Sequence, residues 1–243
     1  MPLYRDVGVV VRTHKLGETD RIITIVTQDS GKVRAVAKGV RKPGSRFGSR
    51  LEPLSHVQVQ LYRGRNLDVV NQVELVEIAT SLRSNLEATT DGLAMCEVVE
   101  QLAHDREPSP HLYRMLVGAL RQLNTAFSPL VLPALQLRLL TTEGVGPCVD
   151  QCVVCGTRED LCAFDVNAGG VQCRAHKRGL GVSDEALQVV QSILDGRVAV
   201  VLQRSSLSTA VAREVAEFAR IAMEHHLERR IRASALFKAP QAG

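Results

Sequence analysis

Aromatic residues are scarce in this sequence. Only 3% of the 243 residues are Phe or Tyr, and Trp is absent. Hydrophobic residues as a whole make up 45%, which is ordinary for a globular protein and sufficient for a sizeable core. The chain therefore has enough apolar material to fold, but few side chains on which nucleic-acid bases could stack.

Long hydrophobic runs are also missing. The longest ones, such as residues 130–132 and 198–202, fall far short of the roughly 20 apolar residues that span a bilayer. Arg5, Asp6 and Arg12 interrupt any apolar segment of a signal peptide. We therefore expect a soluble cytoplasmic protein.

The common catalytic motifs are absent. The sequence contains no phosphate-binding loop of the Walker type, no Gly-x-Ser-x-Gly elbow and no Gly-x-Gly-x-x-Gly fingerprint. The histidines outside a cysteine-rich segment have no nearby pattern of nucleophile and acid, so we expect them to serve packing or the surface. We predict that the protein is not an enzyme.

Acidic residues are missing from one stretch that is rich in Lys and Arg. The first 80 residues hold 13 Lys and Arg against 8 Asp and Glu, whereas the remaining residues are nearly balanced. Between positions 31 and 50 there is no acidic residue at all. Such a run is either a solvated loop or a binding surface for a polyanion. Its basic residues are Lys32, Arg34, Lys38, Arg41, Lys42, Arg46 and Arg50.

The same N-terminal region has the pattern of a small β-barrel. β-branched residues cluster in short runs that are separated by turn signals, and residues 56–61 alternate polar with apolar side chains. Five short strands in about 80 residues, without a long helix, favour a five-stranded OB-fold. We expect the strands at residues 7–12, 22–27, 32–38, 56–62 and 67–76.

After residue 80 the hydrophobic period becomes helical. Ser109-Pro110, Ser128-Pro129 and Ser183 are helix-start signals, and Gly144 is a stop signal. A long last helix is expected from about residue 208 to residue 231. The sequence thus predicts an α+β protein with three parts: an OB-fold over residues 1–80, a helical domain over 81–145 and 181–239, and an insert over 146–180.

The insert contains a cysteine cluster and shows no clear period of helix or strand. Its centre is Cys152-x-x-Cys155, followed after 17 residues by Cys173-x-x-His176. Two short chelating pairs across such a loop are the spacing of a structural zinc site. We predict Zn²⁺ bound by these four residues, with Cys148 or Cys162 as alternatives to His176.

Other interpretations of the cysteines are weaker. A disulfide framework does not suit a chain without an export signal, and a redox pair would need a surrounding βαβ unit that is not visible. A catalytic zinc needs an open coordination position, and the His-x-Glu of base deaminases is absent. The zinc is therefore expected to be structural.

Taken in order along nearly the whole chain, these residues resemble the RecO family of bacterial recombination mediators. The segments that carry the resemblance are Gly17-Glu18-Thr19-Asp20-Arg21, Gly31-Lys32-Val33, residues 37–41, Ser45-Arg46, Leu51-Glu52-Pro53-Leu54, Gly144-Val145-Gly146-Pro147, Cys152-x-x-Cys155-Gly156 and Gly169-Gly170-x-x-Cys173. His176 is a departure, because a fourth cysteine is common there in the family.

The resemblance implies a role in DNA repair by the RecF pathway. It implies binding of single- and double-stranded DNA, annealing of complementary strands, and help in loading RecA onto strands coated by single-strand-binding protein (SSB). The implied partners are RecR and the acidic C-terminal tail of SSB, and the implied location is the nucleoid. An N-terminal OB-fold, a helical C-terminal domain and an inserted zinc module are also implied.

We expect the basic residues of segment 31–50 to bind DNA through phosphates, which makes binding salt-dependent and blind to sequence. Because Tyr4, Phe47 and Tyr62 are the barrel's only aromatic residues, stacking should contribute little. The acidic tail of SSB is a candidate ligand for the last helix, although that face also fits a plain solvated helix end. Its arginines are Arg213, Arg220, Arg229, Arg230 and Arg232.

Two other functions remain open from the residues alone. One is a zinc-stabilised adaptor whose basic face binds an acidic protein rather than DNA. The other is a sequence-specific transcription factor, which the placement of arginines mostly at one end of the longest helix disfavours.

Overall fold

The computed structural model describes residues 2–45, 47–77, 79–204 and 207–233. Among these residues, the first of two compact units contains those up to 127 together with 232 and 233, and the second contains residues 128–231. The first three helices therefore share a unit with the N-terminal strands. The domain boundaries that we predict at residues 80, 146 and 180 follow the change in secondary structure instead, and they stay a prediction.

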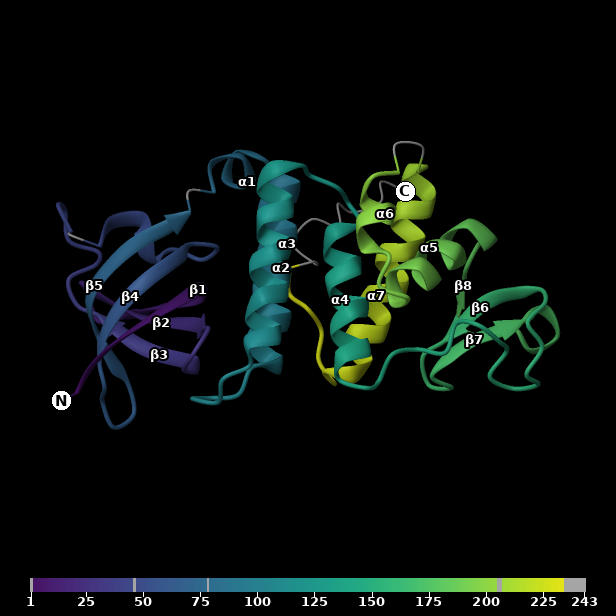
Figure 1. The fold of residues 1–243 in the computed structure, drawn as a ribbon, viewed down its shortest axis with the longest axis horizontal. Coiled ribbons are helices and arrows are strands. Elements are labelled where there is room, and N and C mark those ends of the chain that lie inside the picture. Colours follow the sequence, from purple (N-terminus) through teal and green to yellow (C-terminus); the bar gives the residue numbers. More distant parts are fainter. Residues whose placement is uncertain (1, 46, 78, 205–206, 234–243) are drawn as a thin grey trace. The chain divides into compact units, whose positions relative to one another are not determined.

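The first unit is built on a closed barrel with the strand order β1-β2-β3-β5-β4 (Figure 1). All neighbouring strands are antiparallel except β3 and β5, which run parallel. This confirms the predicted five-stranded barrel of the OB type. Its elements are β1 (Leu3–Leu16), β2 (Asp20–Thr27), β3 (Gly31–Ala37), the 3₁₀-helix η1 (Gly48–Leu51), β4 (His56–Tyr62) and β5 (Asp68–Glu77).

Alternate residues of the strands fill the barrel. Val10 lies opposite Ile25, and Ile25 opposite Val33, so that inward-facing side chains of three strands form one layer. Phe47 and Leu51, from the segment before β4, close the interior and are buried. The core is thus made mainly of small β-branched residues, as the alternation in the sequence indicates.

Strand β1 is longer than the predicted run of residues 7–12. It extends to Leu16, which pairs with Asp20 across a turn at Gly17, and a register shift lies between Val10 and Arg12. The polar residues near this turn are exposed and do not alternate with apolar ones, so periodicity in the sequence does not reveal them as strand. The result is a long β1–β2 hairpin whose turn lies beyond the barrel core.

Three helices accompany the barrel in the first unit: α1 (Thr80–Ser84), α2 (Leu86–Leu102) and α3 (Pro110–Thr125). The side chain of Asn85 caps α2 by accepting from the Ala88 amide at 3.0 Å. Helix α2 packs against β1, and buried His56 of β4 shares a 2.9 Å hydrogen bond with the hydroxyl of Tyr113 on α3. The outer face of β1 is therefore covered.

The loop between α2 and α3 pairs with the edge of β3. The Lys32 amide donates to the His104 carbonyl at 3.2 Å, and the Arg106 amide donates to the Lys32 carbonyl at 3.0 Å. Gly31 permits this approach, because a Cβ there would lie 2.1 Å from the carbonyl oxygen of Glu107. The loop thus extends the sheet where β3 lacks a strand partner.

A buried carboxylate lies at the short seam between β3 and β5, which pair at only two positions. Asp68 has no exposed surface and accepts from Arg106 at 2.7 Å, from the Tyr4 hydroxyl at 2.5 Å and from the Gly64 amide at 2.8 Å. Burial alone would raise the pKa of Asp68, but the hydrogen bonds from Arg106 and Tyr4 outweigh it and lower the pKa. Asp68 is therefore a charged group that depends on its partners.

The second unit contains helices α4 (Val131–Thr142), α5 (Asp184–Leu194), α6 (Val198–Leu202) and α7 (Thr209–His226). The hydroxyl groups of Ser183 and Ser208 cap α5 and α7. Each accepts a hydrogen bond from the backbone amide three residues further along the chain. Helix α7 ends at His226 rather than at the expected residue 231, because Leu227 caps it and Glu228 has a positive φ of 50°. None of the helices in the described residues is long and apolar enough to cross a bilayer.

The insert between α4 and α5 contains a small sheet, although its sequence shows no clear period of strand. The sheet has the order β7-β6-β8 and consists of β6 (Leu161–Asp165), β7 (Gly170–Cys173) and β8 (Leu180–Gly181). Strands of two to five residues are too short for a visible period. Phe164 of β6 stacks on Phe218 of α7 with ring centroids 3.9 Å apart, which anchors the insert to the helices.

Replacing Arg106 by Met should destabilise the first unit, because it leaves the carboxylate of Asp68 buried without its counter-ion. We expect a loss of about 3 kcal/mol, at the low end for a broken buried pair because the Arg106 side chain is 36% exposed. Unfolding in urea measures the effect. The same substitution at exposed Arg114 of α3 is the control, and an equal loss there would contradict the assignment.

Candidate nucleic-acid interface and metal centre

The structure places most of the predicted DNA-binding residues on β3 and on the connection from β3 to β4. Lys38, Arg41 and Lys42 are exposed in the loop after β3, which we call the basic loop (residues 38–45). Arg34 is exposed on β3, and Arg50 is exposed in η1. Arg46 lies outside the described residues.

Lys32 has a different environment from the other cations. Its ammonium group lies 3.4 Å from the carboxylate of Asp105 and donates to the carbonyl of Glu100 at 3.2 Å, and its side chain is only 20% exposed. It is therefore engaged in holding α2 and the α2–α3 loop to the barrel. The sequence could not reveal this role, because Glu100 and Asp105 are far from Lys32 along the chain.

The basic loop is tied to the turn of the β1–β2 hairpin. The Gly39 amide donates to Asp20 Oδ1 at 2.8 Å, and the Arg41 amide donates to the Thr19 carbonyl at 2.9 Å. The Arg41 guanidinium also donates to the Glu18 carbonyl at 2.9 Å. These bonds hold exposed cations at defined positions beside the hairpin.

The barrel's aromatic residues offer little stacking surface. Phe47 is buried in the barrel, and the ring of Tyr4 is half-buried with its hydroxyl bound to Asp68. Tyr62 is 37% exposed. Contact with a polyanion at this surface would therefore depend chiefly on charge.

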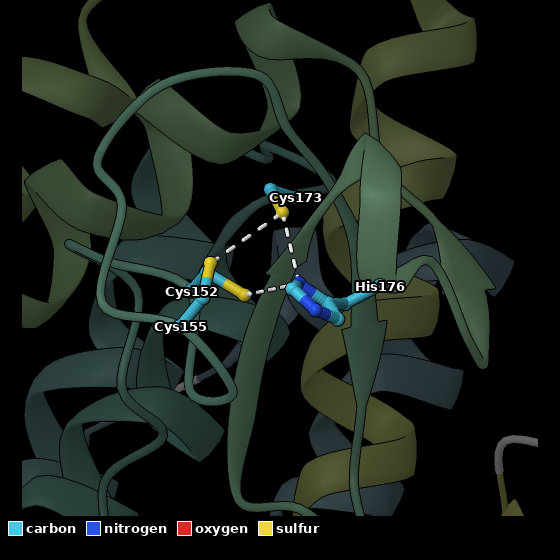
Figure 2. A group of neighbouring side chains, drawn as sticks. All are labelled: Cys152, Cys155, Cys173 and His176. Carbon is cyan, nitrogen blue, oxygen red and sulfur yellow. Dashed lines mark hydrogen bonds between the residues drawn. The ribbon is translucent and has the colours of Figure 1, made fainter.

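A second group of functional side chains lies in the insert of the second unit. Cys152, Cys155, Cys173 and His176 come together so that their ligand atoms all lie within 4.8 Å of one another (Figure 2). Cys152 and Cys155 belong to a turn that ends at Gly156, whose φ is +76°. Cys173 ends β7, and His176 follows in the 3₁₀-helix η2 (Arg174–His176).

The spacing of these atoms fits a tetrahedral metal ion. Cys155 Sγ and Cys173 Sγ are 3.9 Å apart, and His176 Nδ1 lies 3.3 Å from Cys173 Sγ and 3.8 Å from Cys152 Sγ. Metal–sulfur bonds of about 2.3 Å at tetrahedral angles place two sulfur atoms about 3.8 Å apart. The cluster could therefore hold a metal ion with little rearrangement.

Local backbone groups favour the thiolate form of one ligand. Burial raises the pKa of Cys152, but hydrogen bonds from the amides of Cys173, Cys155 and Val154 outweigh it and lower the pKa to about 6. A thiolate is the form that binds metal. Backbone amides of the turn and of the end of β7 thus favour the form of Cys152 that coordinates metal.

The structure brings His176, rather than Cys148 or Cys162, to the other three ligands. Cys148 Sγ lies 3.8 Å from the Gln151 carbonyl, and its backbone pairs with β7 through Val171. Cys162 lies within β6 and is half-buried. Spacing alone left these alternatives open, because it does not tell on which side of the small sheet a side chain lies.

The arginines of α7 and the following segment differ in how they are bound. Arg220 is held between the carboxylates of Glu217 and Glu224, one helical turn to either side. Arg213 is exposed, and so are Arg229, Arg230 and Arg232. Binding of an acidic tail by this region stays a prediction.

Two family models match the chain. The model described as Recombination protein O N terminal matches residues 1–79, and the model described as Recombination protein O C terminal matches residues 83–235. The chain belongs to the recombination protein O family. This supports a general role in DNA repair and recombination, with DNA and recombination proteins as the general class of partners.

Replacing Cys155 by Ser should lower the affinity of the insert for a thiolate-preferring metal ion, because it removes one of four ligands. Titration with Co²⁺, followed by its thiolate charge-transfer absorption, measures the affinity. Cys148→Ser, which leaves the four ligands in place, is the control and should bind Co²⁺ like the unaltered protein. Equal losses in the two variants would contradict the ligand set.

Proposed function

We propose that this member of the RecO family is a non-enzymatic recombination mediator of the RecF pathway. It binds single- and double-stranded DNA through phosphates, anneals complementary strands, and assists loading of RecA onto strands coated by SSB. It acts in the cytoplasm, at the nucleoid. The observation that carries the proposal is the exposed basic loop on an OB-type barrel in a chain matched by both family models.

Charge is the main source of DNA affinity in this proposal. Lys38, Arg41 and Lys42 extend into solvent within a stretch that has no acidic residue. Neutralising phosphates releases counter-ions and gives binding that falls steeply with salt. Because exposed aromatic surface on the barrel is small, single-stranded and duplex DNA should bind with similar affinities.

The same properties suit annealing. Two complementary strands repel each other through their phosphates, and a cationic surface screens that repulsion. Bases that are not stacked on protein side chains need not be released before they pair. The protein would therefore bring strands together without first sequestering their pairing edges.

The metal in this proposal is Zn²⁺ in a structural role. Three cysteines and one histidine are borderline and soft ligands that suit Zn²⁺, and four protein ligands leave no open position for a reacting water. Such an ion would stabilise the turn at Cys152, the end of β7 and the end of η2. Cross-linking them adds to the few apolar side chains that the insert buries, such as Phe164 and Val171.

The proposed protein partners are RecR, the acidic C-terminal tail of SSB and, indirectly, RecA. Exposed Arg213 on α7, and Arg229 and Arg230 after it, are candidate contacts for an acidic tail. The family assignment supports recombination proteins as partners in general, and these particular ones are the finer proposal.

Annealing of two complementary labelled strands, with and without SSB across a salt series, tests the function. We expect acceleration that survives coating by SSB and falls as salt rises. The alternative function, a protein adaptor whose basic face binds an acidic partner, predicts no acceleration by a folded, metal-loaded sample. It also predicts no DNA binding in the absence of a partner.

Replacing Lys38, Arg41 and Lys42 by Gln together should weaken DNA binding most at low salt. The slope of log K against log salt for a single strand should fall in magnitude by about 2, since each phosphate contact contributes about 0.7. Fluorescence anisotropy of a labelled oligonucleotide measures both quantities. Exposed Arg114, Arg158 and Arg204 changed to Gln give a control of equal net charge, and an equal effect there would refute the interface.

A further inference from the structure

We propose that Asp20 is a positioning residue for DNA binding, because its carboxylate holds the basic loop in the form that presents the cations. This inference rests on the proposed function. It is unexpected from charge alone, since an acid beside a phosphate-binding surface should weaken binding.

One carboxylate oxygen makes both of the bonds that matter. Asp20 Oδ1 accepts from the Gly39 amide at 2.8 Å and from the Thr19 hydroxyl at 2.9 Å. Gly39 has a φ of +65°, a conformation that glycine adopts without strain. The first residue of the basic loop after Lys38 is thereby fixed to the hairpin.

The bonds that follow along the loop depend on this attachment. The Arg41 amide donates to the Thr19 carbonyl at 2.9 Å, and the Lys42 amide donates to the Gly39 carbonyl at 3.1 Å. The Arg41 guanidinium donates to the Glu18 carbonyl at 2.9 Å. Residues 39–42 therefore form one turn that is docked on the β1–β2 turn, with Asp20 at its start.

Asp20 is charged under ordinary conditions. Hydrogen bonds from the Gly39 amide and the Thr19 hydroxyl lower its pKa, and nearby Lys38 and Lys42 lower it further. Its charge thus opposes a polyanion while its hydrogen bonds order the cations that attract one. These two effects have opposite signs and can be separated by substitution.

Asp20→Asn separates them because an asparagine retains Oδ1. That oxygen can still accept from both donors, while the negative charge is removed. Asp20→Ala removes the charge and both bonds together. We expect Asp20→Asn to bind a single strand about twofold to threefold more tightly than the unaltered protein, through lost repulsion, and Asp20→Ala to bind about tenfold more weakly, because the loop must then be ordered on binding.

The experiment compares these variants with a matched charge control. Glu18→Gln removes an exposed carboxylate from the same turn and leaves its carbonyl available to Arg41, so it should bind about as Asp20→Asn does. Affinity and salt slope are measured by anisotropy with a labelled single strand. The slope should stay unchanged in all three variants, because the same cations contact phosphates once the loop is ordered.

Thr19→Val keeps the net charge and removes one of the two donors to Asp20 Oδ1. It should weaken DNA binding less than Asp20→Ala does. If Asp20→Ala unfolds, this variant still tests the role of the hydrogen bonds. Affinity equal to that of the unaltered protein in both variants, or tighter binding by Asp20→Ala alongside Glu18→Gln, would overturn the proposal.

Hydrogen exchange without DNA distinguishes a failure of this inference from a failure of the proposed function. The amides of Gly39 and Arg41 should be protected in the unaltered protein and in Asp20→Asn, and unprotected in Asp20→Ala. Protection that persists in Asp20→Ala would refute the positioning role. If Asp20→Ala loses protection but the unaltered protein binds no DNA, the loop is positioned by Asp20 and the proposed function is refuted. The role of the loop in DNA binding is then refuted as well.

Discussion

The first unit depends on one buried carboxylate. Asp68 begins β5 beside β3, the one pair of described barrel strands that run parallel, where just two pairs of residues hold the sheet closed. Tyr4 from β1, Gly64 from the β4–β5 connection and Arg106 from the α2–α3 loop all donate to it. A charge without water needs such donors, and supplying them joins three separate segments. The weakest seam of the barrel is thereby closed by a polar network.

The small sheet in the second unit is connected to its surroundings in another way. Its strands have only two to five residues. The cluster of Cys152, Cys155, Cys173 and His176 gathers the turn before β6 and the end of β7 at one point, and the stacked rings of Phe164 and Phe218 connect the sheet to α7. The candidate metal cluster and this aromatic contact thus add to the few apolar side chains that so small a sheet can bury.

Features encoded locally could be predicted from the sequence. The barrel follows from alternating β-branched runs, the cap at Ser183 from a short motif, and the cluster of cysteines from their spacing. The short strands of the insert were not predicted, because a hydrophobic period needs more residues than they contain. The full length of β1 was not predicted either, since most of its last residues are exposed and polar.

Features that join distant residues could not be predicted. Nothing in the sequence pairs Asp20 with Gly39 or Lys32 with Asp105, because each pair depends on the register of strands and on where a loop crosses them. Lys32 and Lys38 are equivalent when charges are counted along the chain. In the fold one is enclosed by acceptors and the other extends into solvent.

Arg106 lies in the first compact unit but outside the segment matched by the N-terminal family model. The N-terminal family model ends at residue 79, whereas the counter-ion of Asp68 lies 27 residues beyond it. When only the barrel strands have emerged from the ribosome, the carboxylate of Asp68 still lacks its counter-ion Arg106. We therefore expect the barrel to reach its full stability only after α2 and the loop with Arg106 have emerged.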